Sequence, residues 1–138
     1  MKIAEHIEAL RDQGAQLADA AGRAGLDAAV PPCPPWRVRD LLRHTGYIHR
    51  WAARHITERP AHVIDGPPEA AILVGGAADP ELLAWFRAGY AALVEVLSAA
   101  DPALQCATFL DAPSPLAFWA RRQAHETAIH RADADSAC

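Results

Sequence analysis

Two residues near the C-terminal end of the chain, Glu126 and His130, have the types and the spacing of metal ligands. Residues four apart in a helix lie one above the other on the same face. A carboxylate oxygen and an imidazole nitrogen placed in this way are two ligands suited to a divalent metal. Residues 115–134 predict the helix that carries them, because Ser114 suits the N-cap position and Pro115 the first helical position.

The spacing alone leaves two interpretations of Glu126 open. An unpaired carboxylate on the inner face of a helix costs several kcal/mol to bury, so Glu126 needs a cationic partner, a metal or water. In one interpretation an arginine, Arg122 or Arg43, neutralises the carboxylate, and His130 forms a hydrogen bond between helices. In the other interpretation, Glu126 and His130 both bind a metal, and His44 supplies the third ligand from a neighbouring helix.

The order His125, Glu126, His130 is superficially similar to the H-E-x-x-H helix of metalloproteases. In that motif the two histidines are four residues apart, so that both imidazoles share one face, whereas here they are five apart. His125 is rotated by about 100° from Glu126 around the helix. We therefore interpret His125 as a histidine on the surface or at the edge of a groove.

Four stretches of the chain have apolar residues at three- and four-residue steps with polar residues between them, which predicts helices. Prolines and glycines are concentrated in the connections between these stretches. This pattern predicts an all-α protein, an antiparallel four-helix bundle with long Pro/Gly-rich connections. The predicted helices are residues 2–24, 37–58, 80–99 and 115–134.

Two connections have features that bear on a site. Residues 31–35 hold four prolines, which force an extended entry into the next helix, and Trp36 is predicted to pack this linker onto the bundle. The connection of residues 60–79 is long for a small domain, and loops of this length are typically functional or mobile.

Length and charge exclude several classes of function. A chain of 138 residues is long enough to bury one core and predicts a single domain. The formal net charge of −4 provides no basic field for nucleic acid. No apolar stretch approaches the ~18 residues of a membrane span, and the N-terminus has no signal-peptide core. The three cysteines form no CxxC pair. We expect a cytoplasmic protein that binds neither nucleic acid nor membranes.

Two segments resemble the mycothiol-dependent maleylpyruvate isomerase family. Residues 31–44, PPCPPWRVRDLLRH, resemble the family's P-x-C-P-G-W-x-V-R-D-L-L-x-H entry. Residues 118–134, FWARRQAHETAIHRADA, resemble its W-x-R-R-x-x-H-E-x-x-x-H-R-x-D-A segment. The segments occur in the right order, and the match spans the whole chain. Pro35 replaces the family's usual glycine, and Arg37 stands where a Thr or Ser N-cap is common.

The resemblance implies a DinB-like four-helix bundle that binds a divalent metal, usually zinc. The implied ligands are His44, Glu126 and His130, the three positions that spacing also selects. It further implies mycothiol, a low-molecular-weight thiol, as cosubstrate. The metal would activate a thiolate for addition to a small electrophilic substrate, in an isomerase or a thiol S-transferase. A set of two histidines and one carboxylate also suits iron and nickel.

Arg43, Arg122 and Arg131 are candidates for binding carboxylates of the substrate or thiol, each with an ordinary surface charge as the alternative. Two other functions stay open: hydrolysis by zinc-bound water, and a non-catalytic helical module that binds a partner. Members of the family usually continue into a second, smaller α/β domain. Residues 1–138 are then expected to form the N-terminal domain, and a C-terminal domain beyond residue 138 stays open. A homodimer also stays open.

Overall fold

The computed structural model describes residues 1–138 and is all-helical, which confirms the predicted fold class. An isolated bridge between Ala29 and Arg37 is the one β feature. The elements are α1 (Ile3–Ala24), α2 (Val38–Glu58), α3 (Glu69–Ile72), a 3-10 turn η1 (Asp79–Glu81), α4 (Leu82–Ala99) and α5 (Pro115–Ser136).

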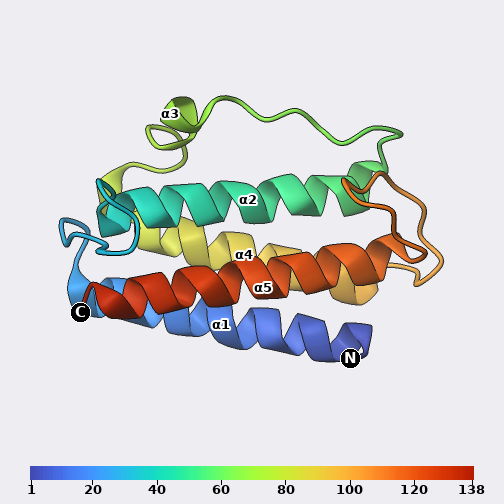
Figure 1. Ribbon diagram of the computed structural model, residues 1–138, viewed down its shortest axis with the longest axis horizontal. Helices are drawn as coiled ribbons and strands as arrows, with labels where there is room; N and C mark the ends of the chain where they lie inside the picture. Colours follow the sequence, from blue (N-terminus) through green and yellow to red (C-terminus); the bar gives the residue numbers. More distant parts are fainter.

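The four long helices form a bundle in which each packs against two others. Helix α1 contacts α5 and α4, and α2 contacts α4 and α5 (Figure 1). Two clusters of buried side chains fill the interior, one around Trp119 and Leu93, the other around Phe86 and Leu41. The packing of α2 on α5 places the two halves of the predicted metal site next to each other.

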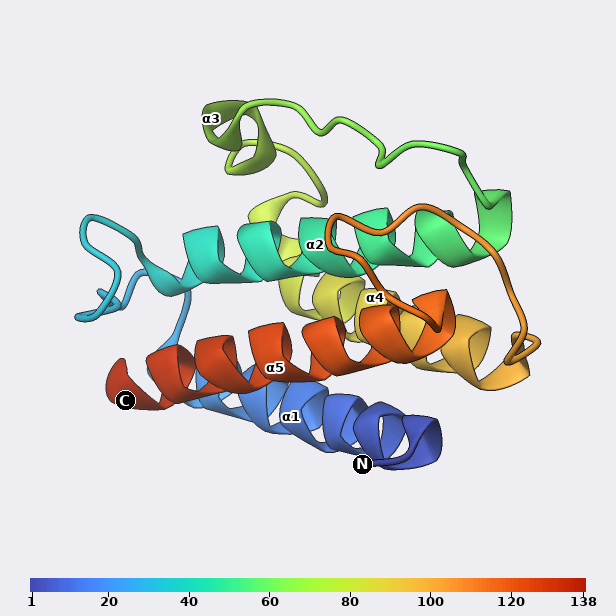
Figure 2. The ribbon, with the colours of Figure 1, turned by 45° about the vertical axis from the view of Figure 1, so that its right-hand side comes forward.

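The connection between α2 and α4 runs back along the length of the bundle, so α4 begins at the end where α2 begins (Figure 1, Figure 2). Helices α2 and α4 therefore run in the same direction, so the all-α bundle is as predicted but its strictly antiparallel arrangement is not confirmed. Helix α3 is a single turn within the connection and lies over the first half of α2. The connection therefore covers the part of α2 that carries His44.

The helix boundaries follow from local sequence signals. The Ser114 hydroxyl accepts a hydrogen bond from the Ala117 backbone amide at 3.2 Å, and Pro115 opens α5 as predicted. Gly25, at a φ of 87°, ends α1 in a conformation that favours glycine. The helix predicted from residue 80 begins with the 3-10 turn η1, and α5 continues two residues beyond the predicted end.

The proline-rich linker folds back on itself before α2. The Val30 amide donates to the Trp36 carbonyl at 3.0 Å, and the Trp36 amide donates to the Cys33 carbonyl at 2.7 Å. The Trp36 side chain is partly buried and packs against the cluster around Phe86. The prediction that this tryptophan holds the linker on the bundle agrees with the structure.

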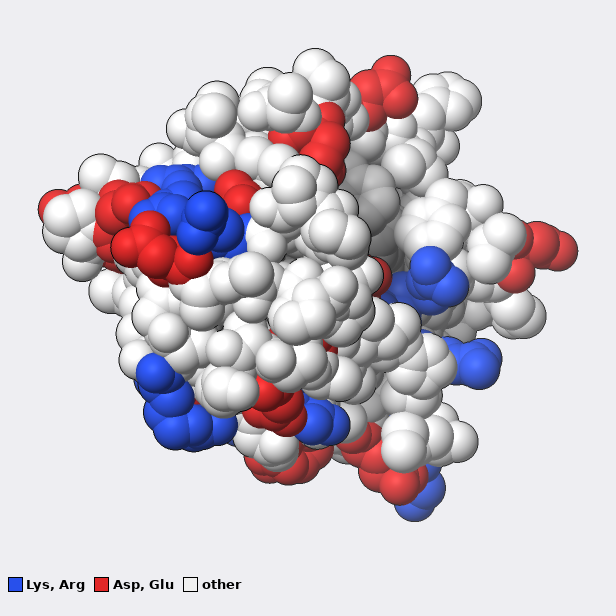
Figure 3. Space-filling model, turned by 60° about the vertical axis from the view of Figure 1, so that its left-hand side comes forward, with Lys and Arg blue, Asp and Glu red and all other residues white.

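The segment Asp79–Ala99 is long and apolar enough to cross a membrane by length and composition, which the sequence analysis did not expect. Its buried residues, among them Leu82, Phe86 and Leu93, face the interior of the bundle. The core helix of a bundle has the same character, so this is weak evidence for a membrane span. On the face drawn in Figure 3, basic and acidic side chains are interspersed, without a field of one sign.

Candidate metal centre

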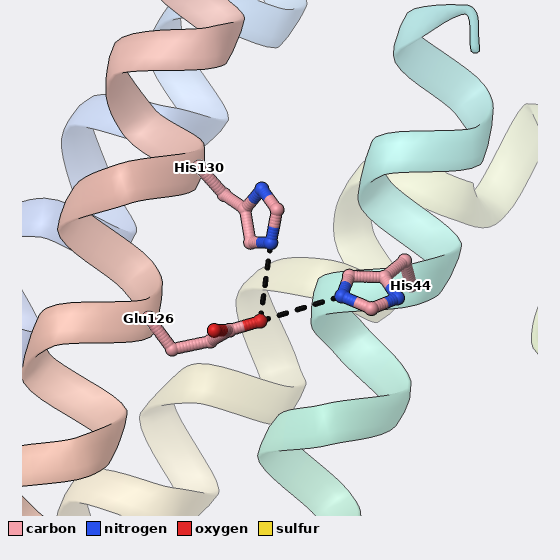
Figure 4. A group of neighbouring side chains, drawn as sticks. All are labelled: His44, Glu126 and His130. Carbon is pink, nitrogen blue, oxygen red and sulfur yellow. Dashed lines mark hydrogen bonds and ion pairs between the residues drawn. The ribbon is translucent and has the colours of Figure 1, made fainter. Parts of the chain in front are cut away.

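His44 of α2 and the pair Glu126 and His130 of α5 converge between the two helices (Figure 4). Glu126 Oε1 lies 3.3 Å from His44 Nε2 and 3.1 Å from His130 Nε2. One ligand atom from each of the three side chains lies within 4.8 Å of the others. The structure therefore brings together the three residues that both the spacing and the resemblance selected.

The site is partly open to solvent. The side chains of His44, Glu126 and His130 keep 18%, 31% and 12% of their exposure. An ion bound at this position would lie between α2 and α5 and near the surface, where a small molecule can reach it.

The outer nitrogen of each histidine is held by a second carboxylate. His44 Nδ1 lies 2.7 Å from Glu69 Oε1, and His130 Nδ1 lies 3.0 Å from Asp133 Oδ2. A carboxylate accepts the Nδ1 proton, so each ring is fixed with Nε2 toward the site. This is the arrangement typical of histidine ligands in metal proteins.

The sequence analysis predicted neither Glu69 nor Asp133 as a partner of a histidine. Asp133 could have been predicted, because it follows His130 by three residues on the same helix face. Glu69 carried no such signal, because it lies in an irregular connection 25 residues from His44.

The electrostatics of the triad favour a charged carboxylate. Hydrogen bonds from His130 and His44 hold the pKa of Glu126 far below its usual range, although burial opposes them. Burial alone would lower the pKa of His44, but hydrogen bonds to Glu126 and Glu69 outweigh it and raise the pKa. The site thus holds a charged carboxylate between two imidazoles, and a bound metal would take the place of the Nε2 protons that this carboxylate accepts.

Neither candidate arginine neutralises Glu126. The Arg43 guanidinium donates to the backbone carbonyls of residues 75 and 77, each at 3.1 Å, and to Asp79 at 2.8 Å. The Arg122 guanidinium lies over the Phe109 ring, 5.0 Å from its centroid. The partners of Glu126 are His44 and His130, the two residues that the metal interpretation names with it.

The third candidate arginine, Arg131, also has partners within the chain. It donates to Gln13 at 2.8 Å and to Asp135 at 2.7 Å. Among the three candidates, Arg122 is the one whose guanidinium has no carboxylate partner.

Trp36 forms one wall of the site. Its ring centroid lies 5.0 Å from that of His44 and 6.5 Å from that of His130. The sequence indicated a tryptophan that packs the linker onto the bundle, but it gave no sign that the ring would also contact two ligand imidazoles.

A buried polar layer lies beneath the triad. His49 is fully buried, and its Nε2 lies 2.8 Å from the Thr127 hydroxyl, which itself donates to the Gln123 carbonyl. His49 Nε2 is therefore the donor, which leaves Nδ1 unprotonated and without a partner. Burial lowers the pKa of His49 to about 3, so its ring is neutral.

Two further histidines, His55 and His125, lie away from the three converging side chains. His55 is buried, with Nδ1 2.9 Å from the Trp51 carbonyl and Nε2 accepting from the Ile64 amide at 3.0 Å. His55 therefore fixes the connection after α2. His125 is exposed and contacts His6 of α1 edge to face, which agrees with its predicted place at the edge of a groove.

Residues 7–135 match the protein family described as mycothiol maleylpyruvate isomerase N-terminal domain. Comparisons with curated proteins and with solved structures found no match. The matched residues cover α2 and α4 in full, most of α1 and α5, and the three converging side chains. The chain therefore belongs to the family of mycothiol maleylpyruvate isomerase N-terminal domains.

Proposed function

We propose that the chain is the metal-binding domain of a thiol-dependent enzyme, with His44, Glu126 and His130 as ligands and mycothiol as cosubstrate. The observation that supports this most directly is the convergence of three ligand atoms while both outer imidazole nitrogens are held by carboxylates. The family to which the chain belongs supports the choice of thiol.

The spacing of the donors fits zinc. Two ligands at about 2.1 Å from a tetrahedral ion are separated by about 3.4 Å. The carboxylate oxygen lies 3.3 Å and 3.1 Å from the two Nε2 atoms, which is close to that separation. Three protein ligands leave a fourth position for a small molecule, as in catalytic rather than structural zinc sites. The donor set also suits iron and nickel.

A bound metal would supply the Lewis acidity that lowers the pKa of a thiol that reaches the fourth position. The residues of the chain orient and enclose that position. Glu69 and Asp133 fix the two imidazoles, and Trp36 covers one side with an apolar ring. The partial exposure of Glu126 leaves a path for the thiol.

The cysteine nearest to the site does not suit the role of nucleophile. Cys33 Sγ lies 3.4 Å from Asp133 Oδ2, and burial, together with this carboxylate, raises the pKa of the thiol. A raised pKa disfavours the thiolate, which is the nucleophilic form. This supports a thiol that comes from outside the chain.

The proposed reaction is addition of the thiol sulfur to an activated double bond of a small electrophile. Rotation about the resulting single bond and loss of the thiol give cis-to-trans isomerisation, whereas retention of the adduct gives S-transfer. We propose Arg122 as the contact for a substrate carboxylate, because it is exposed and lies one helical turn before Glu126. Arg43 and Arg131 already hold Asp79 and Asp135.

A thermal-shift series tests the proposal. Mycothiol, glutathione and cysteine are added to zinc-loaded protein and to chelator-treated protein, with Glu126→Gln as the variant that lacks a charged ligand. We expect mycothiol to raise the melting temperature of the zinc-loaded wild type and of no other sample, because a ligand of the folded state stabilises it.

Two outcomes would contradict the thiol role. If mycothiol raised the melting temperature equally with and without zinc, its binding would not depend on the metal. Zinc-loaded protein that hydrolyses a substrate in the absence of any thiol would indicate an activated water instead.

A further inference from the structure

A cavity of about 1010 Å³ lies along the beginning of α5, and none of the three proposed metal ligands lines it. It is bounded by the first turns of α1, the beginning of α5 and the connection at residues 110–114. The N-terminus and the connection between α4 and α5 meet at this end of the bundle (Figure 1). Four basic or imidazole side chains line the cavity: His6 from α1, and Arg121, Arg122 and His125 from α5.

None of these four side chains forms a hydrogen bond or an ion pair within the chain. Two of them form an aromatic contact, in which His6 packs edge to face on His125 at 6.3 Å between ring centroids. The Arg122 guanidinium lies over the Phe109 ring. Burial and the N-terminal amino group lower the pKa of His6, and nearby His125 and Arg121 lower it further. The His6 ring is therefore neutral at pH 7, and the positive charge of the cavity comes from Arg121 and Arg122, neither of which pairs with a carboxylate.

Most other arginines of the chain differ in this respect. Arg39, Arg54, Arg87 and Arg131, for example, each pair with a carboxylate. The acidic residue that lines the cavity is Asp111, which is exposed and pairs with none of the four groups. The net charge facing the cavity is positive, which favours an anionic ligand.

The remaining walls are apolar or favourable to an anion. Leu110, Ala117 and Phe118 contribute apolar surface, and Leu110 keeps 59% of its exposure. The first turn of α5 lies at the rim, where the helix dipole favours negative charge. A ligand that matches these walls has an anionic head and an apolar body.

The cavity is distinct from the metal centre. His125 adjoins Glu126 in sequence but is rotated by about 100° around α5. It faces His6 of α1, whereas Glu126 faces His44 of α2. Arg122 lines the cavity and also lies one helical turn before Glu126.

We propose that this cavity binds a small organic anion, a carboxylate or a phosphate ester with an apolar body, through His6, Arg121 and His125. The site is independent of the proposed metal, so chelator-treated protein binds the anion as well. Charge-assisted hydrogen bonds from arginine fit both head groups.

Calorimetric titration of chelator-treated protein tests this site, in a buffer without phosphate or carboxylate. The probes are benzoate, phenyl phosphate and inorganic phosphate. We expect saturable binding of one organic probe per chain, with inorganic phosphate weaker because it lacks an apolar body. The tighter of benzoate and phenyl phosphate identifies the head group.

Arg121→Gln is expected to weaken binding by about tenfold or more, because it removes a charge-assisted hydrogen bond. The matched control is Arg23→Gln, which changes an exposed arginine whose nearest carboxylate oxygen, on Asp135, is 4.0 Å away. It should bind like the wild type. His125→Gln provides a second variant should Arg121→Gln fold poorly.

Absence of saturable binding of both organic probes would overturn the proposal. Equal weakening in Arg23→Gln and Arg121→Gln would also overturn it, since that would show attraction to overall charge only. Neither result bears on zinc content, so the proposed metal site stands or falls separately.

Discussion

At the scale of single residues, a carboxylate at Nδ1 fixes the orientation of each imidazole, His44 and His130. Each Nδ1 faces a carboxylate, Glu69 for His44 and Asp133 for His130, so each Nε2 points toward Glu126. Such partners raise the basicity of a ligand and remove alternative ring orientations. On the proposed assignment, five residues and not three determine the affinity for a metal.

Glu69→Gln is predicted to weaken zinc binding by about tenfold, because a neutral amide is a poorer acceptor for the His44 Nδ1 proton. Competition with a chromophoric chelator measures the affinity, and the absorption spectrum of the cobalt-loaded protein reports the ligand geometry. Glu58→Gln, at an exposed glutamate paired with Arg54, is the control. Unchanged affinity in Glu69→Gln would show that Glu69 does not position His44.

His49 is predicted to make the metal-free protein sensitive to acid. The unfolded chain protonates this histidine below about pH 6.5, whereas the folded protein keeps it neutral down to about pH 3. Unfolding therefore takes up a proton, and stability falls with decreasing pH by up to about 1.4 kcal/mol per pH unit.

Urea unfolding at pH 5.0, 6.0 and 7.0 with chelator present measures this effect. Between pH 7.0 and 5.0 the wild type should lose about 2 kcal/mol more than His49→Gln, which has no titrating group at this position. Parallel pH profiles of the two proteins would mean that His49 is accessible to protons in the folded state.

The three converging ligands could be predicted from the sequence, whereas their surroundings could not. Glu126 and His130 share a helix face by spacing alone, and His44 lies in a recognisable segment. The contacts of Glu69 and Trp36 depend on how irregular connections fold over α2, and periodicity does not encode that. The sequence also left open whether an arginine or a histidine pairs with Glu126, because that depends on how the helices and connections pack.

At the scale of elements, the connection between α2 and α4 is tied to the bundle at several points. The Trp51 indole donates to the Ile64 carbonyl at 2.8 Å, and Arg43 reaches the backbone carbonyls of residues 75 and 77. These anchors hold α3, and with it Glu69, above His44. The four long helices were predictable from periodicity, but the return of this connection was not, because helix patterns carry no information on direction.

Arg43→Gln is predicted to loosen this connection. Arg43 is largely buried, and its loss removes hydrogen bonds to two carbonyls and to Asp79. Amide hydrogen exchange in residues 71–75 should accelerate by roughly tenfold, since less free energy then opposes local opening. Arg54→Gln, at an exposed ion pair on the same helix, should leave this exchange unchanged. Equal protection in both variants would contradict the role of Arg43 as an anchor.

At the scale of the whole molecule, a metal between α2 and α5 would link elements that are separated by more than half of the chain. An unfolded chain cannot preform this site, so metal binding contributes to the stability of the folded state. The same argument makes chelation a test of stability as well as of composition.

Removal of zinc is predicted to lower the melting temperature. With free zinc at about a thousand times its dissociation constant, the stabilisation is about 4 kcal/mol, which corresponds to a shift on the order of 10 °C for a chain of this size. Calorimetric scans of zinc-loaded and chelator-treated protein measure it. Identical scans would instead favour a helical module whose function needs no metal.

The central claim, that His44, Glu126 and His130 bind one metal ion, is tested most directly by elemental analysis of the purified protein. We predict one zinc per chain in the wild type and in His62→Ala, which alters an exposed histidine of the connection. His44→Ala is predicted to retain no stoichiometric metal. One tightly bound zinc in His44→Ala, or none in the wild type after zinc loading, would contradict the assignment.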